Sequence, residues 1–179
     1  MDWLRRHIAR PPLMVVDLTD IHRIVQVVGE SHHQGELFAA NGGYMSPEED
    51  KDPSLHAEPD SVAELLAEPN NPYDDQAVAV RINGRAVGYL ARGDAAIYQP
   101  LILKIEGAGH HAICLSRIVG GYVLEDGSRA YFGAELFLSA PDAEGLLPGP
   151  AKPVQETLHD WSRRRVDAAD ILIRKARGH

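Results

Sequence analysis

Only one cysteine, Cys114, occurs among the 179 residues of the chain. A lone thiol excludes an internal disulfide and every zinc site that needs several cysteines. Cys114 stands in the apolar run 112–115, which predicts a buried, unreactive thiol rather than a nucleophile. This cysteine usage is typical of a protein of the reducing cytoplasm, so we expect a cytoplasmic location.

Long apolar runs and catalytic signatures are also missing. No stretch has the roughly 20 consecutive apolar residues that a membrane-spanning helix needs. Residues 1–12 lack a signal-peptide core and predict a short helix that ends at Pro11. The chain has no Walker A phosphate loop, no Gly-x-Ser-x-Gly elbow and no His-Glu-x-x-His zinc motif. We therefore expect a protein that is not an enzyme and has no cofactor, no metal and no membrane segment.

Positive charge is scarce in the middle of the chain. The net charge is −8; residues 21–139 hold 8 basic and 17 acidic residues, whereas residues 152–179 hold 7 basic and 4 acidic residues. Because non-specific binding to long DNA depends on neutralising many phosphates, the central region is not expected to coat DNA. A pocket that grips one or two nucleotides is compatible with this charge.

Short segments rich in Ile, Val and Ala predict mainly β structure. Strands are predicted at 21–28, 61–67, 77–82, 86–90, 111–119 and 130–138. The segment 61–67 also fits a helix by propensity, but the hairpin directly after it favours a strand. Asn83-Gly84 is the strongest short hairpin signal, because both residues tolerate positive φ. Together these segments predict a small, partly closed antiparallel barrel of about six strands, accompanied by helices.

One helix is expected inside this barrel region. Asp94 is its predicted N-cap, and the helix reaches Leu101. Pro100 has no backbone N–H to donate, so we expect this helix to be short, kinked or split.

These patterns divide the chain into four parts. They are an N-terminal extension (1–20), a barrel domain (21–139) with an acidic loop (39–60), a Pro- and Gly-rich linker (140–153) and an amphipathic basic helix (154–179). The basic helix is expected to dock on the barrel or to pair with a second copy. The alternative is a basic arm that follows DNA or docks on the acidic loop.

A polar turn before the hairpin carries the most specific chemistry. It reads Glu-Pro-Asn-Asn-Pro-Tyr-Asp from Glu68 to Asp74. It places an aromatic ring, a carboxylate and two amides side by side, and these groups can stack on a base and hydrogen-bond a sugar hydroxyl. The same residues are also good turn formers, with Asp74 capping its own backbone. The residues alone leave both interpretations open.

From about Val27 to Leu138 the chain resembles the HIRAN domain, a family named for its occurrence in fork-remodelling ATPases of the helicase-like transcription factor type. The resemblance rests on residues 68–74, on the Ala77-Val78 strand and on Val87-Gly88-Tyr89-Leu90. It implies an OB-like barrel that binds single-stranded DNA and, in its best-known members, captures a free 3′ end. It therefore implies a role in DNA repair or replication.

The resemblance also assigns roles to single residues. Tyr73 would stack on a base, and Asp74 would accept a hydrogen bond from the terminal 3′-hydroxyl. Asn71 would support the turn or make a contact. Arg92 stands where a basic residue after the Gly-Tyr-Leu strand meets a phosphate. Tyr122, beside Gly120-Gly121, either reaches a nucleotide from a loop or packs locally.

After the first strand the chain departs from the family pattern. Where those members place a basic residue and an aromatic ring, this chain has Glu30-Ser31-His32-His33. His32 or His33 could still stack on a base, whereas Glu30 near a phosphate would oppose binding. This departure, the negative charge and the terminal helix favour an alternative function: a protein–protein interaction module that keeps the HIRAN fold without the DNA-end pocket.

Overall fold

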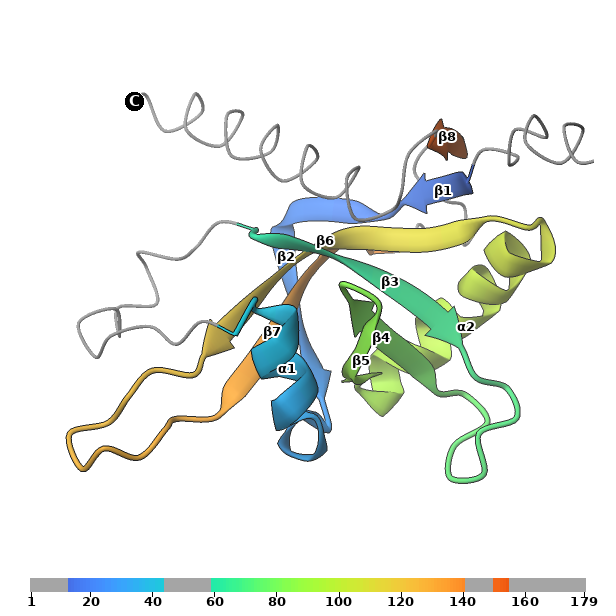
Figure 1. Cartoon of the computed structure of the whole chain (residues 1–179). Helices are drawn as coiled ribbons and strands as arrows, with labels where there is room; N and C mark the ends of the chain where they lie inside the picture. The colour runs from blue at the N-terminus through green and yellow to red at the C-terminus, as the bar shows by residue number, and fades with distance from the viewer. Residues whose placement is uncertain (1–12, 44–58, 141–149, 155–179) are drawn as a thin grey trace, which may run out of the picture.

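Six antiparallel strands close into a barrel in the computed structural model, which describes residues 13–43, 59–140 and 150–154 (Figure 1). Around the barrel the strands are β3 (Ser61–Ala67), β4 (Val78–Ile82), β5 (Arg85–Leu90), β2 (Thr19–Val28), β7 (Phe132–Leu138) and β6 (His111–Gly120). The pairing of β3 with β6 completes the ring. The predicted mainly β, OB-like architecture is confirmed, and the barrel is fully rather than partly closed.

The tight hairpin between β4 and β5 forms as its sequence predicts. Asn83 and Gly84 have φ angles of 52° and 75°, the left-handed backbone that this turn requires. The Asn83 side chain donates from Nδ2 to the carbonyl oxygen of Ala40 at 2.9 Å. The hairpin is thereby tied to the end of the helix α1 (Gln34–Ala40).

The sheet extends beyond the barrel at two places that the sequence pattern did not indicate. β1 (Leu13–Asp17) pairs in parallel with β6, and β8 (Lys152–Val154) pairs antiparallel with β1. β1 is local in sequence to β2, but its partner β6 lies about half the chain away, so no hairpin signal announces it. Strand structure therefore reaches into both the predicted N-terminal extension and the predicted linker.

The short helix α1 was also not predicted. It follows a 3-10 turn, η2 (Glu30–His32), and packs against β5 and β7 with Leu37 fully buried. The Gln34 amide donates to the carbonyl oxygen of Phe132 and accepts from its N–H, both at 2.8 Å. Gln34 thus takes the place of a strand partner at the start of β7, a tertiary contact with no local sequence signal.

The helix α2 (Arg92–Gly107) corrects two predictions. Its N-cap is Ala91, so Asp94 lies in the first turn and does not cap it. The helix also continues through Pro100 instead of ending or splitting there. Its buried face extends on both sides of the proline, and this burial outweighs the one missing hydrogen bond. The buried residues of α2 are Ala95, Tyr98, Gln99, Leu101, Ile102 and Ile105.

The interior of the barrel is apolar and tightly closed. Fully buried side chains from β3, β4, β6, β7 and both helices meet there. Cys114 is among them, which confirms its predicted burial, and this burial raises the pKa of its thiol. None of the helices among the described residues is long and apolar enough to span a bilayer. Val154, where the predicted basic helix begins, is instead the last residue of β8. The rest of that helix, the helix predicted within residues 1–12 and most of the acidic loop lie outside the described residues.

Candidate nucleic-acid interface

The polar turn 68–76 connects the end of β3 to the start of β4 at the rim of the barrel (Figure 1). Its ends are tied together, because Glu68 donates its N–H to the carbonyl oxygen of Ala77 at 2.9 Å. Inside the turn, Asn71 N–H donates to the Glu68 carbonyl at 3.0 Å and Ala77 N–H to the Asp74 carbonyl at 3.1 Å. The turn is thus a structured loop with its own backbone hydrogen bonds.

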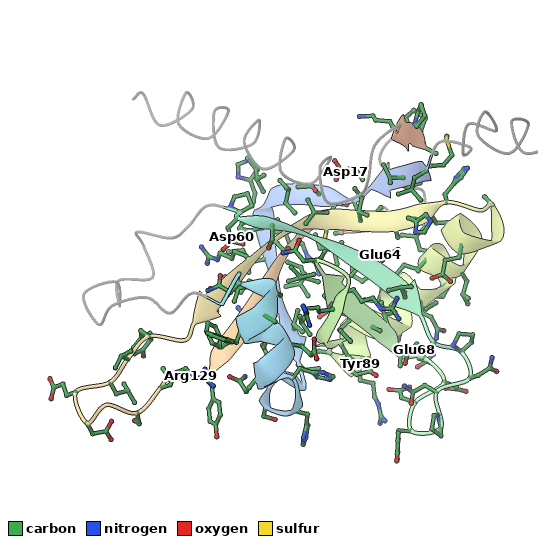
Figure 2. The ribbon with its side chains drawn as sticks, viewed as in Figure 1. Asp17, Asp60, Glu64, Glu68, Tyr89 and Arg129 are labelled. Atoms are coloured by element: carbon green, nitrogen blue, oxygen red, sulfur yellow. The ribbon has the colours of Figure 1, made fainter. Side chains whose placement is uncertain are left out.

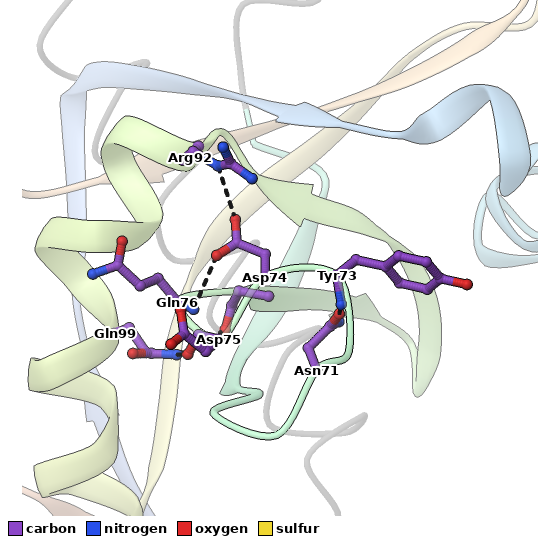
Figure 3. Close-up of polar contacts among 8 residues, drawn as sticks. Asn71, Tyr73, Asp74, Asp75, Gln76, Arg92 and Gln99 are labelled. Atoms are coloured by element: carbon purple, nitrogen blue, oxygen red, sulfur yellow. Dashed lines mark hydrogen bonds and ion pairs between the residues drawn. The ribbon is translucent and has the colours of Figure 1, made fainter.

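Asn71 holds the middle of the turn from both ends of its amide. Its Oδ1 accepts from the Tyr73 N–H at 3.0 Å, and its Nδ2 donates to Glu68 Oε2 at 2.8 Å. The Tyr73 ring projects away from the turn and is 92% exposed (Figure 3). Asn71 therefore supports the turn, as one of its two predicted roles requires, and leaves an aromatic ring facing solvent.

Asp74 is engaged by a backbone group and by a cation. Its Oδ1 accepts from the Gln76 N–H at 3.0 Å, and its Oδ2 lies 3.2 Å from Arg92 Nε (Figure 3). The Gln76 hydrogen bond, and after it Arg92, holds the pKa of the Asp74 carboxyl below its ordinary value. The carboxylate is therefore ionised at neutral pH. Arg92, at the start of α2, is 79% exposed.

A second contact from α2 fixes the turn. The buried Gln99 amide donates from Nε2 to the carbonyl oxygen of Asp75 at 2.6 Å. The rim then carries a shallow polar hollow of about 500 Å³, which we call the turn depression. It brings together the predicted residues Asn71, Tyr73, Asp74 and Arg92. Its lining is Asn71, Pro72, Tyr73, Asp74, Asp75, Gln76 and Arg92.

Tyr89 on β5 is a neighbour of this turn that sequence reasoning did not assign to the site (Figure 2). Partial burial, and next to it the negative charge of Glu68, raises the pKa of its hydroxyl, which also interacts with Asn71. The residue before it, Gly88, has φ +151°, and a Cβ there would lie 2.5 Å from the carbonyl oxygen of Val28. The Gly-Tyr pair of the motif is therefore the sequence signal that could have indicated Tyr89 as a site residue. The glycine permits the close approach of β5 to β2 that fixes Tyr89.

The two histidines predicted for the site do not line the turn depression. His32 is exposed on η2, and the His33 ring lies with its centroid 6.5 Å from that of Tyr89. The carboxylate of Glu30 turns toward β7, where Oε1 accepts from the Ala134 N–H at 3.3 Å. The expectation that Glu30 would oppose a phosphate assumed that its carboxylate faces outward. In the structure the carboxylate contacts the backbone of β7 instead.

Tyr122 lies in a different region from the turn. It belongs to the arm of residues 121–131, which connects β6 to β7 and extends on the other side of α1 from the turn 68–76 (Figure 1). Its carbonyl oxygen accepts from the Ala130 N–H at 3.0 Å within the arm. The structure therefore does not group Tyr122 with Tyr73, and its contact with a nucleotide stays a prediction.

Histidine and carboxylate side chains are dispersed rather than clustered. His111 Nδ1 lies 2.6 Å from Glu64 Oε1 across β6 and β3, which makes a pair and not a ligand set. In the part of the chain that the structure describes, no group of three His, Cys, Asp or Glu residues is arranged to hold a metal ion.

Comparisons with known proteins give one family. The model of the HIRAN domain family matches residues 24–126, more than half of the chain. Among solved structures, the crystal structure of the HIRAN domain of human HLTF is similar, with 21% identity and a TM-score of 0.31 over 69% of this chain and 78% of that chain. No curated protein matches the chain. The family match contains every residue predicted for the site.

Proposed function

Since this chain belongs to the HIRAN domain family, a family of nucleic-acid-binding modules, we propose that it is a non-catalytic module that binds single-stranded DNA at a free 3′ end. We further propose that it does so in DNA repair or replication. The observation that carries the proposal is the turn depression, where an exposed tyrosine ring lies beside an ionised carboxylate and a cation. A strand terminus has a partner for each of these groups: a base for the ring, a hydroxyl for the carboxylate and a phosphate for the cation.

The Tyr73 ring supplies the stacking surface. It is exposed because Asn71 binds the backbone of the turn and no side chain covers the ring among the described residues. A base that stacks on an aromatic ring gains roughly 1–3 kcal/mol, whatever its identity. We therefore expect little preference among the four bases.

Asp74 supplies the selectivity for an end. An ionised carboxylate has about four lone-pair sites, and the Gln76 N–H and Arg92 use two of them. A terminal 3′-hydroxyl can donate its proton to a remaining site in a charge-assisted hydrogen bond. An internal 3′ oxygen has no proton, and its phosphodiester would be repelled by the same carboxylate.

Arg92 supplies the contact to the phosphate. A guanidinium has five N–H donors, and the contact with Asp74 uses the one on Nε. The donors on the two Nη atoms point from an exposed side chain and suit a phosphate oxygen. Because the surrounding domain is acidic, the affinity should be micromolar or poorer, with a shallow dependence on salt.

The test compares fluorescein-labelled octathymidylates that end in a 3′-hydroxyl or a 3′-phosphate, titrated by fluorescence anisotropy at low salt. We expect the 3′-phosphate to bind about tenfold more weakly, because it removes the donor and adds charge beside Asp74. The control carries a 5′-phosphate with an intact 3′-hydroxyl, and it should bind like the unmodified strand. Equal binding of the two 3′ forms would overturn end capture. No binding at all would favour a protein–protein interaction module.

A further inference from the structure

A second polar hollow lies at the other end of β4, beside the turn of the β4–β5 hairpin. We call it the hairpin depression; its volume is about 620 Å³. Two arginines and a histidine line it, in a domain that is otherwise acidic. Its lining is His33, Glu36, Arg81, Asn83, Gly84, Arg85 and Ala86.

The two arginines of the hairpin depression differ in their ion pairing. Arg85 Nη1 lies 2.9 Å from Glu36 Oε2, and both side chains are half exposed. Arg81 is exposed and stands opposite Glu64 in the β3–β4 register. The Glu64 carboxylate is engaged by His111 Nδ1 at 2.6 Å. None of the ion pairs among the described residues includes the Arg81 guanidinium.

Tyr89 links the hairpin depression to the turn depression. In the β4–β5 register Ala79 faces Tyr89 and Arg81 faces Ala86. Alternate residues of a strand share a face, so Tyr89 and Arg81 lie on the same outer face of the hairpin. The Tyr89 ring neighbours His33 of the hairpin depression, and its hydroxyl interacts with Asn71 of the turn depression.

We propose that the hairpin depression binds an internal phosphate of the same single strand whose 3′ end occupies the turn depression, with Arg81 as the main contact. This inference rests on the proposed function and adds a direction: the strand passes over Tyr89 along the outer face of β4 and β5. The carboxylates of Glu36, Glu64 and Glu68 flank that path and would repel further phosphates. We therefore expect this subsite to bind a single phosphate.

The distance between the two depressions predicts a minimum length of DNA. They lie at the two ends of β4, whose five residues span about 16 Å at about 3.3 Å per residue. A stacked strand advances about 3.4 Å per nucleotide, so roughly five nucleotides are needed to reach from one to the other. A dinucleotide that fills the turn depression cannot reach Arg81.

The experiment measures the binding of thymidine dinucleotide and octanucleotide, both with free 3′-hydroxyls, to the full chain and to its Arg81→Ala variant. NMR chemical-shift titration of the ¹⁵N-labelled protein covers the weak dinucleotide, and anisotropy covers the octanucleotide. We expect Arg81→Ala to weaken octanucleotide binding about fivefold and to reduce its salt slope by about 0.7, the value for one phosphate on a single strand. Dinucleotide binding should be unchanged.

Two control variants separate the possible outcomes. Lys104→Ala removes an exposed cation from the last turn of α2 and should change neither affinity. Arg81→Lys should retain most of the octanucleotide affinity, because a phosphate accepts from either cation. An equal loss for both DNA lengths, or no loss for either, would overturn the hairpin subsite while leaving the turn depression intact. Failure of the unmodified protein to bind either DNA would overturn the subsite and the proposed function together.

Discussion

Two acidic turns project from the barrel with the same local chemistry, the turn 68–76 and the tip of the arm 121–131. In the first, Asp74 Oδ1 accepts from the N–H two residues later, at 3.0 Å. In the second, Asp126 Oδ1 does the same with Ser128, at 2.8 Å. The Gln76 N–H lowers the pKa of the Asp74 carboxyl, and the Ser128 hydroxyl, followed by the Ser128 N–H, lowers the pKa of the Asp126 carboxyl. Each region also presents an exposed tyrosine, Tyr73 at 92% and Tyr131 at 78%.

The two turns differ in what the rest of the fold brings to them. Asp74 meets Arg92, which comes from another element and stays exposed. Asp126 is satisfied by its own loop, through the Ser128 hydroxyl at 2.5 Å. The cation of the arm, Arg129, has its Cζ 5.5 Å and 5.6 Å from the ring centroids of Phe38 and Phe132. The two regions thus share a lowered pKa and an exposed ring, and the cation supplied from α2 sets the turn 68–76 apart.

The largest expected difference concerns the glycines that support each region. Gly88→Ala should lower the free energy of unfolding by about 3 kcal/mol, because the new Cβ would lie 2.5 Å from the Val28 carbonyl oxygen. Gly127→Ala, at the tip of the arm, should cost about 1 kcal/mol, because only its φ of +79° is unfavourable and no atom lies within 4 Å. Urea unfolding of both variants measures the two values, and similar losses would contradict the described approach of β5 to β2.

A smaller difference is expected between the two exposed tyrosines. Tyr73→Ala should weaken the binding of a 3′-hydroxyl octanucleotide about tenfold, within the range for the loss of one stacked base. Tyr131→Ala removes a ring of similar exposure from the arm and should leave the affinity unchanged. Anisotropy titrations at low salt provide the comparison. Equal effects of the two substitutions would show that exposure alone, and not the turn depression, determines binding.

The smallest difference is expected between the two aspartates. Asp74→Asn keeps an oxygen for the Gln76 N–H but removes the negative charge, so binding of a 3′-hydroxyl strand should weaken about threefold. Asp126→Asn should have no effect. Because the pKa of Asp74 lies below its ordinary value, the carboxylate stays ionised between about pH 7 and about pH 5. Binding that depends on it is lost only as the pH falls further, through the folded-state pKa.

The pH dependence has its own control. A titrating group other than Asp74 would affect the wild type and Asp74→Asn alike. The ratio of their two Kd values should therefore stay constant from about pH 7 to about pH 5. A ratio that changes across that range would mean that the Asp74 carboxyl itself titrates there, which would contradict its lowered pKa.

Much of the barrel could be predicted because its signals are local. Segments of β-branched residues and the Asn83-Gly84 turn mark β4 and β5 within a few residues of each other. β1 and α1 were missed because their stabilising partners lie far along the chain: β6 for β1, and Phe132 for the Gln34 amide. The predicted break at Pro100 was wrong because a local propensity was overridden by burial of the face of α2.

The residues of the candidate site also divide into those with a local sequence signal and those brought together by distant contacts. Asn71, Tyr73 and Asp74 are neighbours in the sequence, and a motif can place them together. Arg92 joins them because α2 starts beside the turn, and the family resemblance rather than spacing indicated it. Tyr89 and Arg81 share an outer face only through the β4–β5 register, which includes a shift between Val80 and Arg81. No pattern in the linear sequence specifies that register.

The way the sheet ends has a consequence for behaviour at high concentration. Ring closure between β3 and β6 gives every strand of the barrel a neighbour on both sides, so the outer edge of the sheet lies at the outermost described strand, β8. That strand has three residues and includes Lys152 and Pro153. A short edge that carries a lysine and a proline is a poor template for adding the strand of another molecule. We therefore expect this edge to resist edge-to-edge aggregation.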